Sequence, residues 1–475
     1  MHKKAPEEAV TSLHDLSAVD LIAGYRAKQF SPSEVLEEVL AHVAVWEPHI
    51  KALYLFDPEG ARATAKASTE RWSSGEPMGT LDGVPVTIKD NIATRGVPVP
   101  LGAASVKLTP SPVDAPPAAR LREAGAVIFS KTTMPDYGML SSGLSSFHPL
   151  TRNPWNLGMN PGGSSAGAGA AGAAGYGPLH VGTDIGGSIR LPAGWCGLVG
   201  LKPSGGRVPI DPSYYGRAAG PLTRTVEDAA LMMATLSLPD ARDYSSLPPQ
   251  ALDWRVKPLD WRGRKVGLLI EAGCGDKPRP AVRREVERAA RNIAAAGAVV
   301  EPLAPFLNQE MLDGLDRFWR MRSLLDLDAL PAKKRAEVLP FIRNWAEAAK
   351  GLDGETVFRG FNQMREMAKA TVAATLPYDF VISPTAPDVA YPAEWAMPSN
   401  HPDSAMAHIG FTVAYNMSEQ PAATVNCGYD PDGLPIGLQI IGRRFDDLGV
   451  LSAAMALEAT RASEARAWPE PPNQK

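Results

Sequence analysis

Apolar residues recur at helical spacing in several stretches of the chain. The first stretch follows Ser31-Pro32-Ser33-Glu34, which supplies an N-cap serine, a proline at the first helical position and a glutamate at N3. One face of the helix predicted there carries Val35, Leu36, Val39, Leu40 and Val43. A second capped helix is predicted from Thr225 onward, a mainly helical region over 309–375 and a closing helix over 448–459.

Short β-branched runs bounded by glycine and proline predict strands between and after these helices. The expected strands cover residues 84–89, 126–131, 265–270, 298–303, 380–383, 423–426 and 436–441. Helical stretches at 115–124 and 282–296 separate consecutive strands, and such βαβ arrangements imply parallel pairing. The pattern therefore predicts an α/β fold, in which the proline- and serine-rich residues 239–258 cross the surface.

Composition narrows the expected partners and compartment. The 475 residues include 48 Lys+Arg and 52 Asp+Glu, a net charge of −4, without a basic block typical of binding to nucleic acid or an anionic membrane. Three widely spaced cysteines argue against a disulfide framework and against a Cys/His zinc site. The chain shows neither an apolar leader nor an apolar run of membrane-spanning length. We therefore expect a cytoplasmic protein that acts on a small, neutral molecule.

Lys89 ends the apolar run Val84–Lys89 and is the first residue that suggests chemistry. A lysine at a strand end is ordinarily a solvated charge, but burial among Val84, Val86 and Ile88 would weaken its hold on the proton. To be neutral near pH 7, Lys89 needs a pKa roughly 3 pH units below about 10.4, a destabilisation of about 4 kcal/mol. Because neighbouring residues of a strand alternate in direction, we expect Asp90 to point away from the Lys89 amine.

Two glycine- and serine-rich segments follow. Pro161–Gly167 leads directly into an alanine-rich helical run, which favours a tight loop at a helix N-terminus over a flexible linker. In Gly182–Arg190, consecutive small residues before Ser188 allow backbone N–H groups to turn inward and form an oxyanion hole. A phosphate-binding loop would need a lysine immediately before its serine or threonine, and Ser188 follows a glycine.

Taken together and in this order, the three segments resemble the amidase signature family. Its members carry a lysine on a strand, a GGSS loop and a GTDxGGSIRxPA block, and here Ser188 follows Ser164 by 24 residues and Lys89 by 99. The resemblance implies a single α/β domain over residues 1–475, with a mixed, mainly parallel β-sheet flanked by helices. It places a catalytic core at 65–230 and a divergent, partly helical substrate-pocket region at 240–400.

Roles for individual residues follow from the same resemblance. Ser188 is expected to be the nucleophile, Ser164 a proton relay after a cis peptide bond, and Lys89 the base; this chemistry requires neither metal nor organic cofactor. The expected oxyanion hole consists of the backbone N–H groups of Ile185, Gly186, Gly187 and Ser188. The residues expected to support the loops are Ser165, Asp184 and Arg190. The chain departs from the usual family pattern at Ala166, Ala168 and Trp195.

The predicted reaction is hydrolysis of small, apolar or aryl amides by a monomer or homodimer that binds neither nucleic acid nor membrane. The residues expected to line an apolar pocket are Met134, Met139, Leu140, Leu144, Phe318 and Trp319, with further aromatic candidates at Phe341, Trp345, Phe358 and Phe361. Carbamates, including urethanes, and esters are alternative substrates, because the same acyl transfer would cleave them. A glutaminase subunit of a tRNA-dependent amidotransferase is a further alternative, and it too would use the triad.

A Ser-His-Asp hydrolase is the nearest rival mechanism, because Gly162-Gly163-Ser164-Ser165-Ala166 differs by one residue from G-x-S-x-G. None of the eight histidines stands in a motif that identifies it as a partner for this serine. They are His2, His14, His42, His49, His148, His180, His401 and His408. We therefore expect each of them to be structural.

Overall fold

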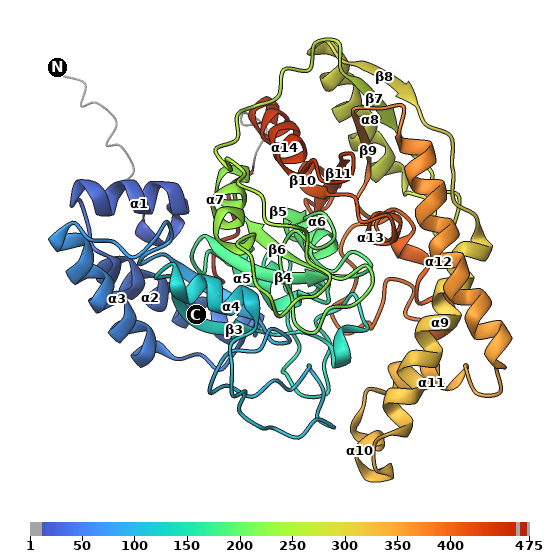
Figure 1. The fold of residues 1–475 in the computed structure, drawn as a ribbon, viewed down its shortest axis with the longest axis horizontal. Coiled ribbons are helices and arrows are strands. Elements are labelled where there is room, and N and C mark those ends of the chain that lie inside the picture. The colour runs from blue at the N-terminus through green and yellow to red at the C-terminus, as the bar shows by residue number, and fades with distance from the viewer. Residues whose placement is uncertain (1–11, 462–465, 473–475) are drawn as a thin grey trace.

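One sheet of 11 strands runs through the molecule, with helices on both sides of it (Figure 1). The computed structural model describes residues 12–461 and 466–472. The strands lie in the order β1-β3-β2-β4-β6-β5-β10-β11-β9-β7-β8. Their bounds are β1 Leu53–Tyr54, β2 Pro85–Lys89, β3 Val127–Thr132, β4 Leu179–Asp184, β5 Val199–Lys202, β6 Ala218–Thr223, β7 Lys265–Leu268, β8 Val299–Pro302, β9 Phe380–Pro384, β10 Ala422–Tyr429 and β11 Pro435–Ile441.

The helices pack around the sheet, and α5 is buried in the interior. At the N-terminal side lie α1 Ala18–Ala27, α2 Pro32–Ile50 and α3 Pro58–Ser74, followed along the chain by α4 Pro116–Glu123, α5 Ala166–Ala174, α6 Arg190–Cys196 and α7 Val226–Leu236. The later helices are α8 Pro280–Ala295, α9 Gln309–Asp328, α10 Ala332–Glu337, α11 Pro340–Glu347, α12 Gly354–Thr375, α13 Val413–Met417 and α14 Asp447–Arg461. Short 3-10 helices occupy Leu13–Asp15, Asp136–Gly138, Pro402–Ser404 and Ala407–Ile409.

The sheet confirms the predicted α/β class and its mixed character but not the predominance of parallel pairing. Parallel neighbours occur at β2–β3, β2–β4, β7–β8 and β7–β9, so the βαβ unit built by α8 is confirmed. The other six pairings, from β1–β3 to β11–β9, are antiparallel. The expectation of a mainly parallel sheet was wrong because β6 runs antiparallel between β4 and β5, and β10 and β11 form a hairpin whose short loop 430–434 cannot carry a crossover.

Helix α5 explains the alanine- and glycine-rich run of the sequence. All nine of its residues are buried, and it packs against β2, β3, β4 and α6. Only small residues permit this approach: a Cβ atom added at Gly167 would lie 2.3 Å from the carbonyl oxygen of Ala52. The loop that precedes α5 is therefore fixed directly above the ends of the parallel strands.

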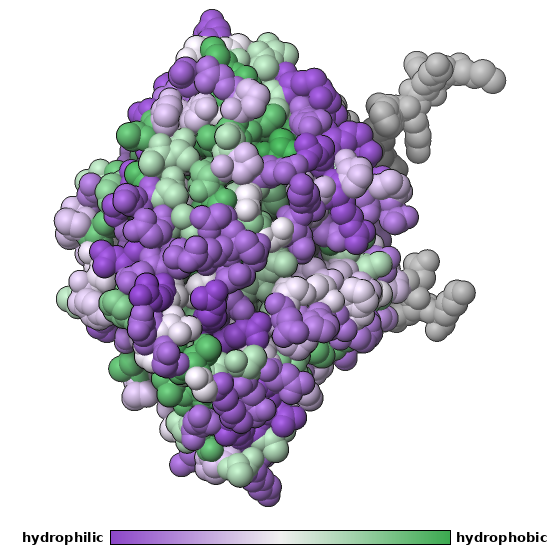
Figure 2. Space-filling view, turned by 90° about the vertical axis from the view of Figure 1, so that its right-hand side faces the viewer, coloured by the Kyte–Doolittle hydropathy of each residue, from purple (hydrophilic) through white to green (hydrophobic). Residues whose placement is uncertain are grey.

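Helices α9 and α12 pack against each other on the side of the molecule opposite α1–α3 (Figure 1). Phe318 and Phe361 meet in this interface, with ring centroids 5.4 Å apart. The outward surface on this side mixes hydrophilic and hydrophobic residues (Figure 2), and Phe358 on α12 is 63% exposed. Among the described residues, no helix has both the length and the apolar character needed to span a membrane.

Helix α6 lies unusually close to strand β11, which leads to a stability prediction. A Cβ atom at Gly437 would lie 2.8 Å from the Cα of Gly194 and 2.9 Å from Thr385 Oγ1, so Gly437→Ala forces backbone apart. We expect a loss of about 1–3 kcal/mol in the free energy of unfolding, measured by urea denaturation. The control is Gly354→Ala at the start of α12, where an added Cβ contacts nothing within 4 Å. Equal midpoints for the two variants would contradict the predicted close packing.

Candidate functional site

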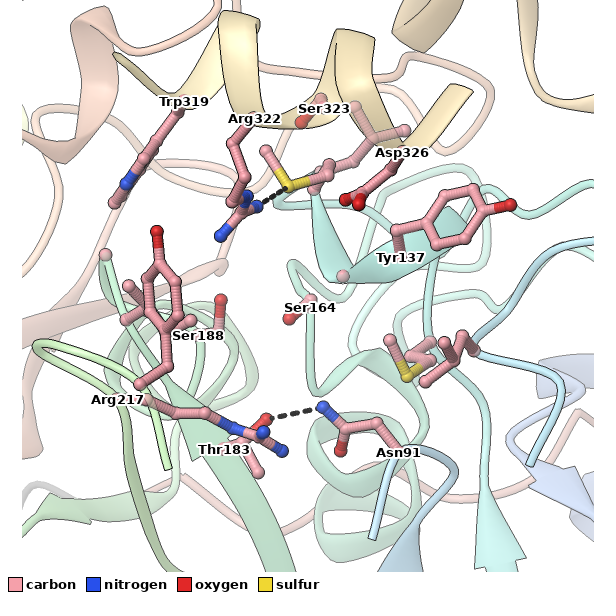
Figure 3. Close-up of a pocket in the computed structure, with 18 of the residues that line it drawn as sticks. Asn91, Tyr137, Ser164, Thr183, Ser188, Arg217, Trp319, Arg322, Ser323 and Asp326 are labelled. Atoms are coloured by element: carbon pink, nitrogen blue, oxygen red, sulfur yellow. Dashed lines mark hydrogen bonds between the residues drawn. The ribbon is translucent and has the colours of Figure 1, made fainter. Parts of the chain in front are cut away.

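A cavity of about 610 Å³ opens where the parallel strands β2 and β4 end. Parallel neighbours bring their carboxyl ends to one edge of a sheet, so Lys89 at the end of β2 lies beside the segment that follows Asp184 at the end of β4. Ser164 and Ser188 line the cavity, and helix α9 covers it from the opposite side (Figure 3). The three segments predicted from the sequence therefore converge.

Lys89 is fully buried, and its amine is surrounded by hydroxyl groups. Nζ lies 2.8 Å from Ser164 Oγ, 3.0 Å from Ser165 Oγ and 3.0 Å from Thr183 Oγ1. Asp90 points to the other side of the strand, as expected, where its carboxylate accepts from the Gly102 amide at 2.9 Å and contacts His148 Nε2. The amine thus has hydroxyl groups beside it and no direct contact with the carboxylate of Asp90.

This environment favours a neutral amine. Burial lowers the pKa of Lys89 well below its ordinary value, and the positive charge of Arg217 lowers it further. Asp184 and Asp90 act in the opposite direction, but more weakly. A neutral amine 2.8 Å from Ser164 Oγ can accept the hydroxyl proton of that serine.

The loop before α5 holds Ser164 between Lys89 and the cavity. The Gly163–Ser164 peptide bond is cis, as the resemblance implied. The backbone N–H of Ser165 donates to the carbonyl oxygen of Ser188 at 3.2 Å, so the two serine-bearing loops are joined. The side chains of Ser164 and Ser188 point into the same part of the cavity (Figure 3).

The segment from Ile185 to Ser188 presents backbone donors, although one fewer than predicted. The Gly187 N–H donates to Asp184 Oδ1 at 2.8 Å and is turned away from the cavity. Gly187 has a φ of +130°, a conformation that glycine adopts without strain. In the described part of the chain the N–H groups of Ile185, Gly186 and Ser188 have no acceptor. Three of the four predicted donors are therefore available to an oxyanion.

A buried ion pair fixes this segment from behind. Asp184 accepts from Arg190 Nη2 at 2.9 Å and from the Ile189 N–H at 3.0 Å, and Arg190 also reaches Gln439 Oε1 at 2.6 Å. Burial by itself would raise the pKa of Asp184, but the guanidinium of Arg190 and the hydrogen bonds bring it below its ordinary value. Because Arg190 also holds Asn416, the ion pair joins the segment to α13 and β11.

The apolar part of the cavity wall is not the aromatic wall expected from the sequence. Of the predicted residues, Met134, Met139, Leu140 and Trp319 line it, while Leu144 and Phe318 do not. Phe318 packs between α9 and α12, Trp345 is buried against Asp316, and Phe341, Phe358 and Phe361 also lie outside the cavity. The remaining apolar wall is formed by Ala93, Val99, Leu101, Ile185, Pro212, Leu327, Ile342, Met397, Met406 and Ile409.

Trp195, one of the departures from the family pattern, lies behind the serine loop. It is 2% exposed, and its indole N–H donates to the carbonyl oxygen of Asp388 at 2.8 Å. A Cβ atom at Gly162 would lie 2.5 Å from the Trp195 ring, so this tryptophan packs on the loop that carries Ser164 without reaching the cavity.

Several polar cavity residues were not predicted. They are Asn91, Tyr137, Ser141, Thr183, Asp211, Ser213, Tyr214, Arg217, Arg322, Ser323 and Asp326. On α9 the cavity residues recur at Trp319, Arg322, Ser323, Asp326 and Leu327, a single helical face. This spacing was visible in the sequence, but the choice between the face of Phe318 and the face of Trp319 required the position of α12.

A serine–histidine mechanism receives little support from the geometry. Among the described residues no histidine lines the cavity, and His2 lies outside them. His408 Nε2 does lie 2.7 Å from Oγ of the cavity residue Ser141. Burial lowers the pKa of His408 to about 3, and the Ser141 N–H already faces the Met397 sulfur. The N–H of Ser141 is therefore occupied, unlike the N–H of Ser188.

Comparisons with known proteins agree with this geometry. Residues 34–451 match the family model described as Amidase. The chain is 34% identical to the A subunit of the glutamyl-tRNA(Gln) amidotransferase of Symbiobacterium thermophilum, over 95% of this chain and 98% of that protein. It is 33% identical to an acylamidase of Rhodococcus erythropolis, over 95% and 96%. The crystal structure of a bacterial aryl acylamidase of the amidase signature family superposes with a TM-score of 0.87 at 29% identity, covering 94% of this chain and 96% of the other.

The buried pair of Asp184 and Arg190 gives a second stability prediction. The carboxylate of Asp184 is fully buried, and among the described residues Arg190 is the only cation in direct contact with it. Arg190→Met removes this cation. We expect the free energy of unfolding to fall by roughly 3–5 kcal/mol, measured by urea denaturation at pH 7. The control is Arg255→Met, which breaks a surface pair whose arginine is 90% exposed and should leave the midpoint unchanged. A similar midpoint in both variants would contradict the central place of the buried pair.

Proposed function

The chain belongs to the amidase signature family and is an amide-hydrolysing enzyme, and from this premise we propose that it works through Ser188 as nucleophile, Ser164 as proton relay and Lys89 as base. The observation that carries the proposal is the contact of Lys89 Nζ with Ser164 Oγ at 2.8 Å, in a buried site where the amine loses its proton readily. Ser188 lines the same cavity next to the three available backbone N–H groups.

In the proposed acylation, neutral Lys89 accepts the proton of Ser164 while Ser164 accepts the proton of Ser188. The Ser188 oxygen forms a bond to the substrate carbonyl carbon, and the negative charge that develops on the carbonyl oxygen is stabilised by the N–H groups of Ile185, Gly186 and Ser188. The C–N bond then breaks. The amine leaves with a proton that returns from Lys89 through Ser164.

In the proposed deacylation, water repeats the sequence in the place of Ser188. Ser164 takes a proton from the attacking water and passes one to Lys89. The bond between Ser188 and the acyl carbon breaks, and the Ser188 oxygen recovers its proton from the relay. The products are a carboxylic acid and an amine, and every proton is accounted for by Lys89, Ser164 and Ser188.

Small amides with an apolar or aryl body are the substrates we propose. Support comes from the methionine and aliphatic wall of the cavity and from the acylamidase and aryl acylamidase among the similar proteins. We further propose that residues 240–400 set the substrate preference within the domain, because α9, Ile342 and Met397 line the cavity that holds Ser188. The triad alone does not distinguish amides from carbamates or esters, since all three substrates would give an acyl-enzyme on Ser188.

A glutaminase component of an amidotransferase is the second candidate, favoured by the 34% identity with an amidotransferase of that kind. The apolar cavity wall favours the stand-alone amidase. A panel of anilides, aliphatic amides, aryl carbamates, 4-nitrophenyl esters and glutamine, assayed with the purified chain, separates these activities. Glutamine hydrolysis that requires added partner subunits, without turnover of the other compounds, would favour the amidotransferase.

Lys89 provides the sharpest mutational test of the proposed base. We expect Lys89→Ala to lower kcat/KM for a 4-nitroanilide by roughly 10²–10⁴-fold, because it removes the proton acceptor. Lys89→Arg should be equally impaired, since a guanidinium stays protonated at all accessible pH values. The control is Lys350→Ala at an exposed position. Near-normal activity of Lys89→Arg would contradict a neutral amine base.

The effect of Arg217 on the pKa of Lys89 leads to a prediction of how kcat/KM depends on pH. Because only neutral Lys89 can accept a proton, kcat/KM should fall as the pH drops through the lowered pKa of Lys89. Arg217 contributes to that lowering, so Arg217→Gln should raise the pKa and move the acidic limb of the profile to higher pH. Arg359→Gln, on the exposed face of α12, should leave the limb in place. An acidic limb that does not move in Arg217→Gln, or moves to lower pH, would count against this electrostatic coupling.

A further inference from the structure

Arg322 is a cation directed into the substrate cavity, and its polar atoms are poorly matched. It extends from α9 toward the part of the cavity that holds Ser188 and Ser164 (Figure 3). Nη2 lies 2.9 Å from the sulfur of Met139, and Nε is buried without a hydrogen-bond partner in the described part of the chain. A thioether is a weak acceptor, so the hydrogen-bonding capacity of the guanidinium is largely unused.

The neighbouring arginine on the same helix shows what a satisfied guanidinium looks like here. The Nε of Arg320 donates to Oδ2 of Asp316 at 2.6 Å, and its guanidinium also donates to the carbonyl oxygens of Trp345 and Pro402. For Arg322, the described residues offer no carboxylate within 4.0 Å. Asp326 stands one helical turn further on and lines the cavity, but no ion pair joins it to Arg322 in that same part of the chain.

Two further features of this wall favour a ligand. The guanidinium carbon of Arg322 lies 5.1 Å from the centre of the Tyr214 ring, a cation–π contact that favours this position of the group. Ser323, adjacent to Arg322, is 5% exposed and lines the cavity, and its hydroxyl has no partner among the described residues. A planar fork of donors and an unused hydroxyl, from neighbouring residues of α9, thus line the same cavity of mixed apolar and polar character.

Buried polar groups are stable when they are paired, and a planar guanidinium pairs best with a carboxylate through two parallel N–H···O bonds. We propose that Arg322, assisted by Ser323, binds a carboxylate carried by the substrate, so that the preferred amides combine an apolar body with an anionic end. This inference rests on the proposed function, because it names the substrate class of the same site. Arg322 then determines specificity by holding a group remote from the bond that Ser188 attacks.

Two pairs of probes test both places where the carboxylate can stand. On the acyl side, N-succinyl-4-nitroaniline is compared with N-(4-methylpentanoyl)-4-nitroaniline, in which an isopropyl group replaces the carboxylate at equal shape. On the amine side, 4-acetamidobenzoate is compared with 4-isopropylacetanilide. The quantity measured is the ratio of kcat/KM for the charged and neutral member of each pair.

We expect Arg322→Gln to lower that ratio roughly 10–100-fold in at least one pair, because a hydrogen-bonded charge pair is lost while the neutral member is unaffected. Arg322→Lys should lose less, since it keeps the charge without the planar fork. Arg317→Gln is the matched control on α9, because Arg317 does not line the cavity. Ratios that change less than about twofold in both pairs, or that fall only in Arg217→Gln, would overturn the assignment to Arg322.

Binding measured without turnover separates this inference from the proposed function. In a Ser188→Ala background, calorimetry compares the dissociation constants of the same four probes with and without Arg322→Gln. A loss of the carboxylate preference in Arg322→Gln supports the subsite even if no amide is hydrolysed by the wild type, a result that would refute the proposed function alone. Equal constants for charged and neutral probes in both backgrounds would refute the subsite, whatever the activity.

Discussion

Lys89 is an amine held in the protein interior with the hydroxyl groups of Ser164, Ser165 and Thr183 as its nearest partners. A buried amine paired with a carboxylate would stay protonated, whereas burial among hydroxyls favours the neutral form. The surrounding structure keeps carboxylates from pairing with the Lys89 amine. Asp90 turns to the other face of the strand, Asp184 is held by Arg190, and Arg217 adds a positive charge near the cavity.

The fold also brings Lys89, the Ser164 loop and the Ile185–Ser188 segment together. Parallel pairing of β2 with β4 brings Lys89 and the Ile185–Ser188 segment to one edge of the sheet, and the small residues of α5 allow the Ser164 loop to sit against that edge. The buried pair of Asp184 and Arg190 then connects the segment to α13 and β11. The packing of α13 and β11 is thereby coupled to the direction of the backbone donors.

The residues of the candidate site could be predicted from sequence because they lie in contiguous motifs, where the need for small residues arises from the local backbone. The capped helices at Ser31 and Thr225 and the βαβ unit around α8 were predictable for the same reason. Strand β4 was not, because its end falls within a glycine-rich motif that resembles a loop. The antiparallel centre of the sheet depends on pairings between distant segments, which local patterns do not encode. The prediction of the residues that line the cavity was the least accurate. Phe318 and Trp319 are adjacent on α9, and only the packing of α12 decides which of them faces the cavity.

Ser188 is the residue on which we propose that the covalent intermediate forms, and trapping that intermediate is the decisive experiment. The enzyme is mixed with a 4-nitrophenyl ester, quenched in acid within milliseconds to seconds, digested and analysed by mass spectrometry. We expect the acyl group on the peptide that contains Ser188 and no acyl group on that peptide in Ser188→Ala. An acyl group on Ser164 or Ser141, or one that persists in Ser188→Ala, would contradict this proposal.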